Sequence, residues 1–143
     1  MKKLFFITAI ALLTFGHSYA EASKDVKELK VQMSNGFLRE YSTSEVVTNY
    51  SIETSTSKLS GDFTKYSYTT GIDTILTNSA TYQYFAGKKD CVIISVIESG
   101  IAKGYVDINA DGILDEFISG GKKYTGIAYQ KGYETFLDFA LHG

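Results

Sequence analysis

The stretch that most constrains this chain is residues 104–117, GYVDINADGILDEF. Within it, four carboxylates and one asparagine surround a single glycine, at Asp107, Asn109, Asp111, Asp115 and Glu116. Carboxylates at this density repel one another unless a cation lies between them. Alternate residues of a tightly curled loop can point their oxygens at one centre. We therefore expect the chain to curl around an ion here.

The spacing of the oxygens matches that of a known class of loop. With Asp107 as position 1, the further candidates are Asn109 at 3, Asp111 at 5, Ile113 at 7 and Asp115 at 9. This pattern resembles EF-hand calcium loops, in which side-chain oxygens at positions 1, 3 and 5, a main-chain carbonyl at 7 and a group at 9 surround the ion. The resemblance implies that Gly112, at position 6, makes the sharp turn of the loop.

The pattern departs from the EF-hand in two respects. Position 12, where EF-hands carry a bidentate glutamate, is Ile118, and the nearest substitute is Glu116 at position 10. EF-hand loops lie between two helices, whereas residues 101–108 alternate like a strand. The stretch looks more like the strand-flanked DxDxDG calcium loops of secreted bacterial proteins, some of which use an Asp–Glu pair at positions 9 and 10.

This resemblance implies a calcium ion with a structural role. Magnesium fits less well because it prefers fewer protein ligands and more water. Without the position-12 glutamate we expect weak binding, with Kd on the order of 10⁻⁴ to 10⁻³ M, as in extracellular modules. The alternative is a plain polar turn, because Asn, Asp and Gly also favour turns for local reasons.

The N-terminus predicts export from the cytoplasm. Two lysines precede an apolar run from Leu4 to Phe15, and small residues follow, which is the order found in a secretory signal peptide. The run is shorter than the roughly 20 residues that span a membrane. Cleavage after Ala20 or after Ala22 fits, and we take the second, giving a signal peptide of residues 1–22 and a single domain of residues 23–143. We expect the product in the periplasm or outside the cell, with no membrane insertion of the mature chain.

Composition makes several classes of function improbable. The formal net charge is −2 with no long run of either sign, so we expect no nucleic-acid partner. Cys91 is the only cysteine, which excludes an intrachain disulfide, and its apolar surroundings predict an inert buried thiol. His17 lies in the signal peptide and His142 next to the C-terminus, so a histidine-based hydrolase triad or zinc site is improbable.

Apolar periodicity predicts an α+β fold, mostly antiparallel β-sheet with a C-terminal amphipathic helix. Residues 29–33 alternate ahead of an Asn-Gly pair, which favours a strand and hairpin, with a helix from Ser23 to Met33 as the alternative. We expect strands within the Ser/Thr-rich residues 42–81, joined by turns at residues 60–62 and at Gly71; a disordered spacer is the alternative.

Two later segments carry clearer patterns. Residues 91–99, CVIISVIES, are mostly apolar on both alternating faces, which predicts a central strand buried on both sides. Near the C-terminus, apolar residues recur at helical spacing, at Tyr133, Phe136, Leu137, Ala140 and Leu141.

The tyrosines leave two interpretations open. Tyr66 with Tyr68, and Tyr82 with Tyr84, would each share one strand face, either exposed to stack on sugars or peptides or packed in a core. We expect a small calcium-binding module with a non-enzymatic binding or structural role and an unknown protein, peptide or glycan partner. A small hydrolase using carboxylates or metal-bound water is the alternative.

Overall fold

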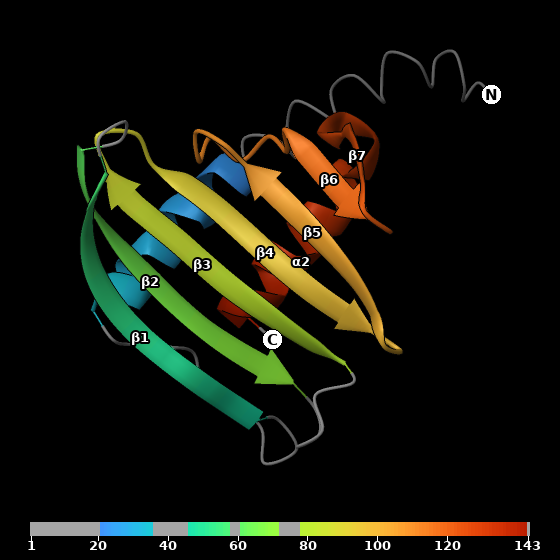
Figure 1. Cartoon of the computed structure of the whole chain (residues 1–143), viewed down its shortest axis with the longest axis horizontal. Coiled ribbons are helices and arrows are strands. Elements are labelled where there is room, and N and C mark those ends of the chain that lie inside the picture. The colour runs from blue at the N-terminus through green and yellow to red at the C-terminus, as the bar shows by residue number, and fades with distance from the viewer. Residues whose placement is uncertain (1–20, 36–45, 58–60, 72–77, 143) are drawn as a thin grey trace.

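The computed structural model describes residues 21–35, 46–57, 61–71 and 78–142. It contains one seven-stranded sheet with helices before and after it, so the predicted α+β class is confirmed. The strands are antiparallel, and each pairs with its neighbour in sequence (Figure 1). They are β1 (Val46–Ser57), β2 (Gly61–Gly71), β3 (Ser79–Gly87), β4 (Cys91–Glu98), β5 (Ile101–Asp107), β6 (Glu116–Ser119) and β7 (Lys122–Thr125).

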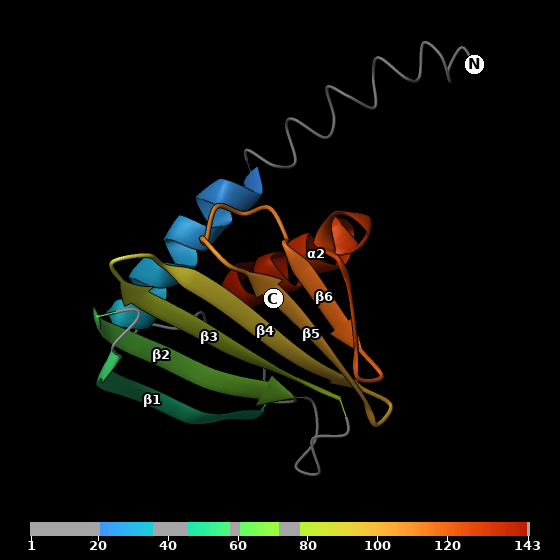
Figure 2. The same cartoon turned by 45° about the horizontal axis from the view of Figure 1, so that its top comes forward.

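Two helices lie on the same face of the sheet. Residues 21–34 are helical, and we call them the N-terminal helix. The C-terminal helix α2 (Gln130–His142) follows a short 3-10 turn, η1 (Gly126–Tyr129). Both views of the ribbon show the two helices on one side, and no described element covers the other side, which we call the open face (Figures 1 and 2). None of the described helices is both long and apolar enough to cross a membrane.

The core lies between the sheet and the two helices. One cross-strand row on the helix side consists of Tyr68, Tyr82, Ile94, Tyr105 and Phe117, all of them buried. The rings of Tyr68 and Tyr82 stack with their centroids 5.1 Å apart. Both residues and Tyr84 are buried, and the partly buried Tyr66 packs against the core. These tyrosines therefore pack in the core, which was the second of their two interpretations.

The predicted N-terminal strand is wrong, because residues 21–34 form a helix. Its buried side chains recur at helical spacing, at Ala22, Val26, Leu29 and Met33. Leu29 and Met33 belong both to this stripe and to the alternating pattern. Residues 29–33 alone therefore fit a strand as well as a helix. Val31, which a strand would place beside them, is 51% exposed. The glycine of the expected hairpin lies outside the described residues.

The predicted burial of residues 91–99 on both sides is also wrong. β4 is central in the sheet and its helix-side residues Val92, Ile94 and Val96 are buried. On the open face Cys91 and Ile93 are only partly buried and Ser95 is exposed. Both helices lie on one side of the sheet, so one face of the strand stays uncovered. Burial raises the pKa of the Cys91 thiol, with the Asp107 and Asp115 carboxylates adding to the effect.

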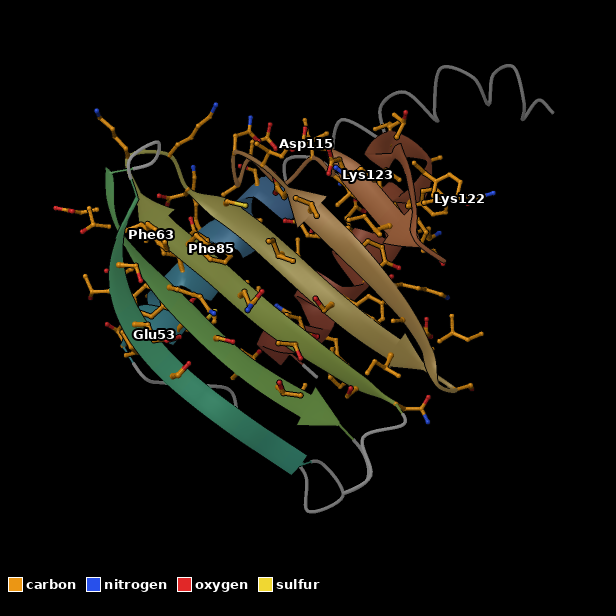
Figure 3. The ribbon with its side chains drawn as sticks, viewed as in Figure 1. Glu53, Phe63, Phe85, Asp115, Lys122 and Lys123 are labelled. Atoms are coloured by element: carbon orange, nitrogen blue, oxygen red, sulfur yellow. The ribbon has the colours of Figure 1, made fainter. Side chains whose placement is uncertain are left out.

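The Ser/Thr-rich segment is a hairpin where it is described. β1 and β2 pair along their length, and β2 begins at the predicted turn residue Gly61 and ends at Gly71. Residues 42–45, 58–60 and 72–77 of the segment lie outside the described part. On the open face, Phe63 of β2 lies near Phe85 of β3, with ring centroids 6.0 Å apart (Figure 3).

An ion pair joins the N-terminal helix to the turn between β3 and β4. Asp90 accepts hydrogen bonds from Tyr84 Oη at 2.7 Å, Lys30 Nζ at 2.9 Å and the amide of Gly87 at 3.1 Å. Partial burial raises the pKa of Asp90, but these three donors outweigh that effect and leave it below its usual value. The ionised carboxylate is therefore the form that stabilises this contact.

Replacing Leu29 or Val31 by alanine tests the helical assignment. We expect Leu29→Ala to lower the free energy of unfolding by about 2–5 kcal/mol, because it opens a cavity in the core. The matched Val31→Ala change on the exposed side should stay within about 0.5 kcal/mol. Denaturant unfolding measures both, and equal losses would indicate the alternating strand instead.

Replacing Asp90 by alanine tests the ion pair. At pH 7 we expect a loss of about 1–3 kcal/mol, because the partly buried Tyr84 hydroxyl loses its acceptor. A group with a lowered folded-state pKa stabilises above its unfolded-state pKa and loses that effect as pH falls through the folded value. The difference between wild type and Asp90→Ala should therefore shrink below pH 3.8, the usual value. The exposed Asp62→Ala is the control, and a difference that grows in acid would contradict this assignment.

Candidate metal centre

Asp107 points toward the helices because of its place in β5. Tyr105 and Asp107 are two residues apart on this strand, so both face the helix side, and Asp107 lies opposite the buried Val92 of β4. The Asp107 side chain is 0% exposed. The chain then leaves the sheet and returns to it at Glu116, the first residue of β6. The strand that the sequence predicted before the loop is thus present, and a second strand follows the loop. We call residues 107–115 the acidic loop.

The acidic loop is curled by hydrogen bonds to its own carboxylates. Asp107 Oδ1 accepts the amide of Asp111 at 3.2 Å, and Asp107 Oδ2 accepts the amide of Gly112 at 2.9 Å. At the other end, Asp115 Oδ2 accepts the amide of Ile108 at 2.8 Å. The amide of Asp115 donates to the carbonyl of Val106 at 3.0 Å, which closes the loop where the two strands meet.

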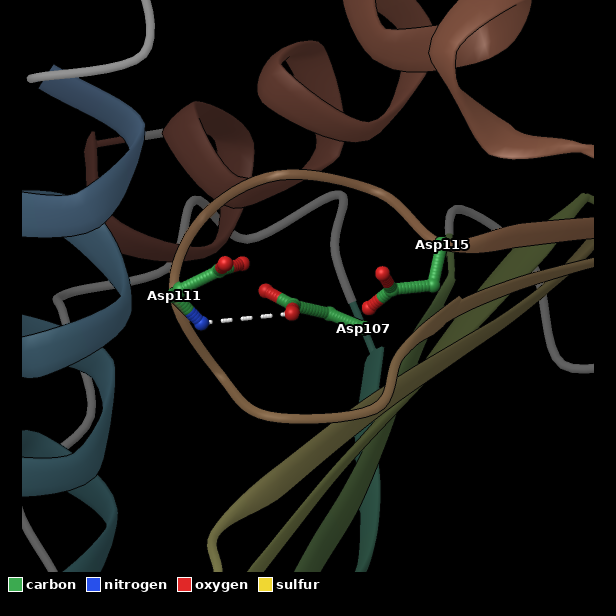
Figure 4. Close-up of side chains that lie close together, drawn as sticks. All are labelled: Asp107, Asp111 and Asp115. Carbon is green, nitrogen blue, oxygen red and sulfur yellow. Dashed lines mark hydrogen bonds between the residues drawn. The ribbon is translucent and has the colours of Figure 1, made fainter.

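Three carboxylates converge inside this curl. One oxygen each of Asp107, Asp111 and Asp115 lies within 4.8 Å of the others, an arrangement that could hold a metal ion (Figure 4). A carboxylate has about four lone-pair positions. The bonds described use one such position on Asp115 and one on Asp111, which accepts the amide of Ile113 at 2.9 Å. Both side chains therefore keep oxygen positions for a cation.

The buried carboxylate of Asp107 is electrostatically costly. Burial raises its pKa to about 6, the Asp111 carboxylate adds to this, and hydrogen bonds from Tyr133 and the loop amides oppose it. Three acceptor positions of Asp107 are occupied by these donors, so about one remains. A cation beside Asp107 would offset the cost of burying its charge. The donor set therefore fits a hard metal ion.

The other predicted ligands have different surroundings. Asn109 is exposed, and Ile113 is exposed while its amide donates to Asp111. These contacts do not test whether the Asn109 side chain or the Ile113 carbonyl is a ligand. Both remain predicted ligands. Glu116 is outside the cluster of three carboxylates, and its Oε1 lies 3.9 Å from Lys123 Nζ.

Helix α2 holds the acidic loop through two side chains that the sequence pattern did not identify as part of the site. Tyr133 Oη donates to Asp107 Oδ2 at 2.7 Å. Gln130 is buried, accepts the amide of Leu114 at 2.7 Å and donates to the carbonyl of Gly112 at 2.8 Å. The helical spacing of Tyr133 placed it correctly on the apolar face, but its hydroxyl partner lies 26 residues away in sequence.

The N-terminal helix contacts the acidic loop at Gly112. Its φ of +90° lies in the left-handed region that side chains rarely adopt. A methyl group there would also lie 2.7 Å from the carbonyl carbon of Ala22 and the Cα of Ser23. Only glycine fits this contact, which supports the role that the sequence predicted for Gly112 as the sharp turn.

Comparisons with known proteins give no relative. No family model matches the chain, and no curated protein or solved structure matches it. The local geometry of the loop is therefore the basis for assigning a function. It shows three aspartates able to hold a metal ion, held between the sheet and both helices.

Replacing Tyr133 by phenylalanine tests the support from α2. We expect a loss of about 1.5–3 kcal/mol in the free energy of unfolding, because a buried carboxylate loses a hydrogen-bond donor. Tyr124→Phe, at a side chain that is 41% exposed, should change it by no more than about 0.5 kcal/mol. Chemical denaturation in calcium measures both, and equal effects would remove Tyr133 from the site.

Proposed function

We propose that this protein is a small periplasmic or extracellular calcium-binding module, in which the calcium is structural and the domain has a non-enzymatic binding or structural role. The observation that carries the proposal is the convergence of Asp107, Asp111 and Asp115 in one curled loop. The loop also has the glycine and the spacing of DxDxDG calcium loops.

The choice of calcium follows from the chemistry of the donors. All three clustered groups are carboxylates, and hard cations prefer oxygen ligands. Calcium accepts six to eight oxygens in flexible geometry, so carbonyls, Asn109 and water can complete its shell. Magnesium requires near-octahedral geometry and releases its water reluctantly, which suits a loop with several converging aspartates less well.

The structural role follows from what the acidic loop touches. Its Asp107 carboxylate is bonded to Tyr133 of α2, and Gly112 packs on Ala22 and Ser23 of the N-terminal helix. An ion bound in the loop would therefore stabilise the attachment of both helices to the sheet. A ligand that binds only the folded state stabilises it by RT ln(1 + [L]/Kd).

A weak calcium site of this kind suits a protein that is exported from the cytoplasm. The signal-peptide pattern of residues 1–22 predicts a location outside the cytoplasm. Extracellular calcium modules work with Kd values of about 10⁻⁴ to 10⁻³ M, the range that we expect for this loop. A protein, peptide or glycan is the class of partner that we propose for the module.

Thermal unfolding of the protein purified after export tests the calcium site. At about tenfold excess over Kd, calcium should add about 1.4 kcal/mol of stability. For a domain of this size we expect the melting temperature to rise by roughly 3–6 °C. The rise should be absent in Asp107→Ala and Asp111→Ala and should persist in the exposed Asp62→Ala.

Three results would contradict the proposal in whole or in part. If the curves in calcium, in magnesium and in chelator coincide for wild type, the acidic loop is a polar turn and not a metal site. If Asp111→Ala retains the full calcium response, the ion binds elsewhere. A response to magnesium as large as that to calcium would overturn the choice of metal but keep the site.

A further inference from the structure

We propose that a signal peptidase cuts the Ala20–Glu21 bond and not the Ala22–Ser23 bond, so that the mature chain begins at Glu21. This revises the start at Ser23 that we took from the sequence alone. The inference rests on the proposed export of the protein. The reaction is an amide hydrolysis, in which water adds across the bond to leave a carboxylate on Ala20 and an α-ammonium group on Glu21. Both bonds follow small residues at the two required positions, so the sequence permits either.

The burial of Ala22 is the first argument. Its side chain is 1% exposed and belongs to the core cluster, in a stripe with Val26 and Leu29. Cleavage after Ala22 would remove a core residue from the folded protein. Cleavage after Ala20 keeps Ala22 in the chain.

The contact between Ser23 and the acidic loop is the second argument. Gly112 lies so close to this part of the helix that a methyl group on it would overlap the backbone nitrogen of Ser23. In a chain that begins at Ser23, this nitrogen would be the charged α-ammonium group. A positive charge against the acidic loop would oppose the binding of a cation there. A start at Glu21 keeps an uncharged amide at this contact.

The charges around Glu21 are the third argument. Glu21 and Asp25 of the N-terminal helix and Glu134 and Asp138 of α2 line a depression of about 160 Å³ between the two helices. Burial raises the pKa of Asp25, the Asp138 and Glu21 carboxylates add to this, and the neighbouring His142 and Lys24 act in the opposite direction. An α-ammonium group on Glu21 would bring a positive charge to the edge of these four carboxylates.

The mass of the exported protein tests the cleavage site directly. The full chain is expressed in a bacterium, and the protein is purified from the periplasm or the medium for intact-mass measurement. We expect the mass of a chain that begins at Glu21. A chain that begins at Ser23 would overturn this inference while leaving the proposed export in place. An uncleaved chain retained in the cytoplasm would overturn both.

A matched pair of variants separates the two bonds. Ala20→Gln places a large side chain before the proposed bond, so the Glu21 product should disappear. Ala22→Gln makes the same change before the alternative bond, and processing to Glu21 should continue. The processed mass is the readout in both cases, so a folding defect from Ala22→Gln does not hide the result. The reverse pattern would overturn the proposal.

A comparison of the two chains tests the physical reason. Chains that begin at Glu21 and at Ser23 are prepared with defined starts and titrated with calcium. The Ser23 chain should bind calcium about 3- to 10-fold more weakly, because its ammonium group lies at the acidic loop. Its melting temperature in chelator should also be lower by roughly 3–8 °C, from the loss of Ala22. Equal affinity and equal melting would contradict the structural argument.

Discussion

The buried carboxylate of Asp107 is the interaction on which the arrangement of this domain depends. It ends a central strand, is excluded from solvent and accepts hydrogen bonds from the amides of Asp111 and Gly112 and from Tyr133 of helix α2. A charge in this position is costly unless donors or a cation surround it. The curl of the acidic loop supplies the donors and brings two further carboxylates to the same place.

The acidic loop connects the three parts of the fold. Gln130 and Tyr133 hold it to α2, and Gly112 also lies against Ala22 and Ser23 of the N-terminal helix. The two helices cover the same face of the sheet, so both can contact the one loop that follows β5 (Figure 2). A bound ion would thus act on the attachment of both helices as well as on the loop, which is why we propose a structural role.

Local patterns in the sequence predicted much of the fold and part of the site. The α+β class and the C-terminal helix followed from apolar residues that recur with periods of two and 3.6 residues. The acidic loop followed from the spacing of its oxygen-bearing side chains. The strand prediction for the N-terminal segment was wrong because Leu29 and Met33 fit both the strand period and the helix period over a few residues. The prediction that β4 is buried on both faces was wrong because no local pattern indicates that both helices pack on one side of the sheet. Tyr133 and Gln130 were missed as parts of the site because their loop partners are distant in sequence.

Hydrogen exchange of the exported protein, compared in calcium and in chelator, tests the central claim most directly. If one ion stabilises the attachment of both helices, calcium should slow exchange in residues 21–34 and in residues 130–142 together with the acidic loop. The hairpin of β1 and β2 lies at the edge of the sheet opposite β6 and β7 and should change least. Slowing confined to residues 107–115, or no change with calcium, would contradict the claim that this loop holds the domain together.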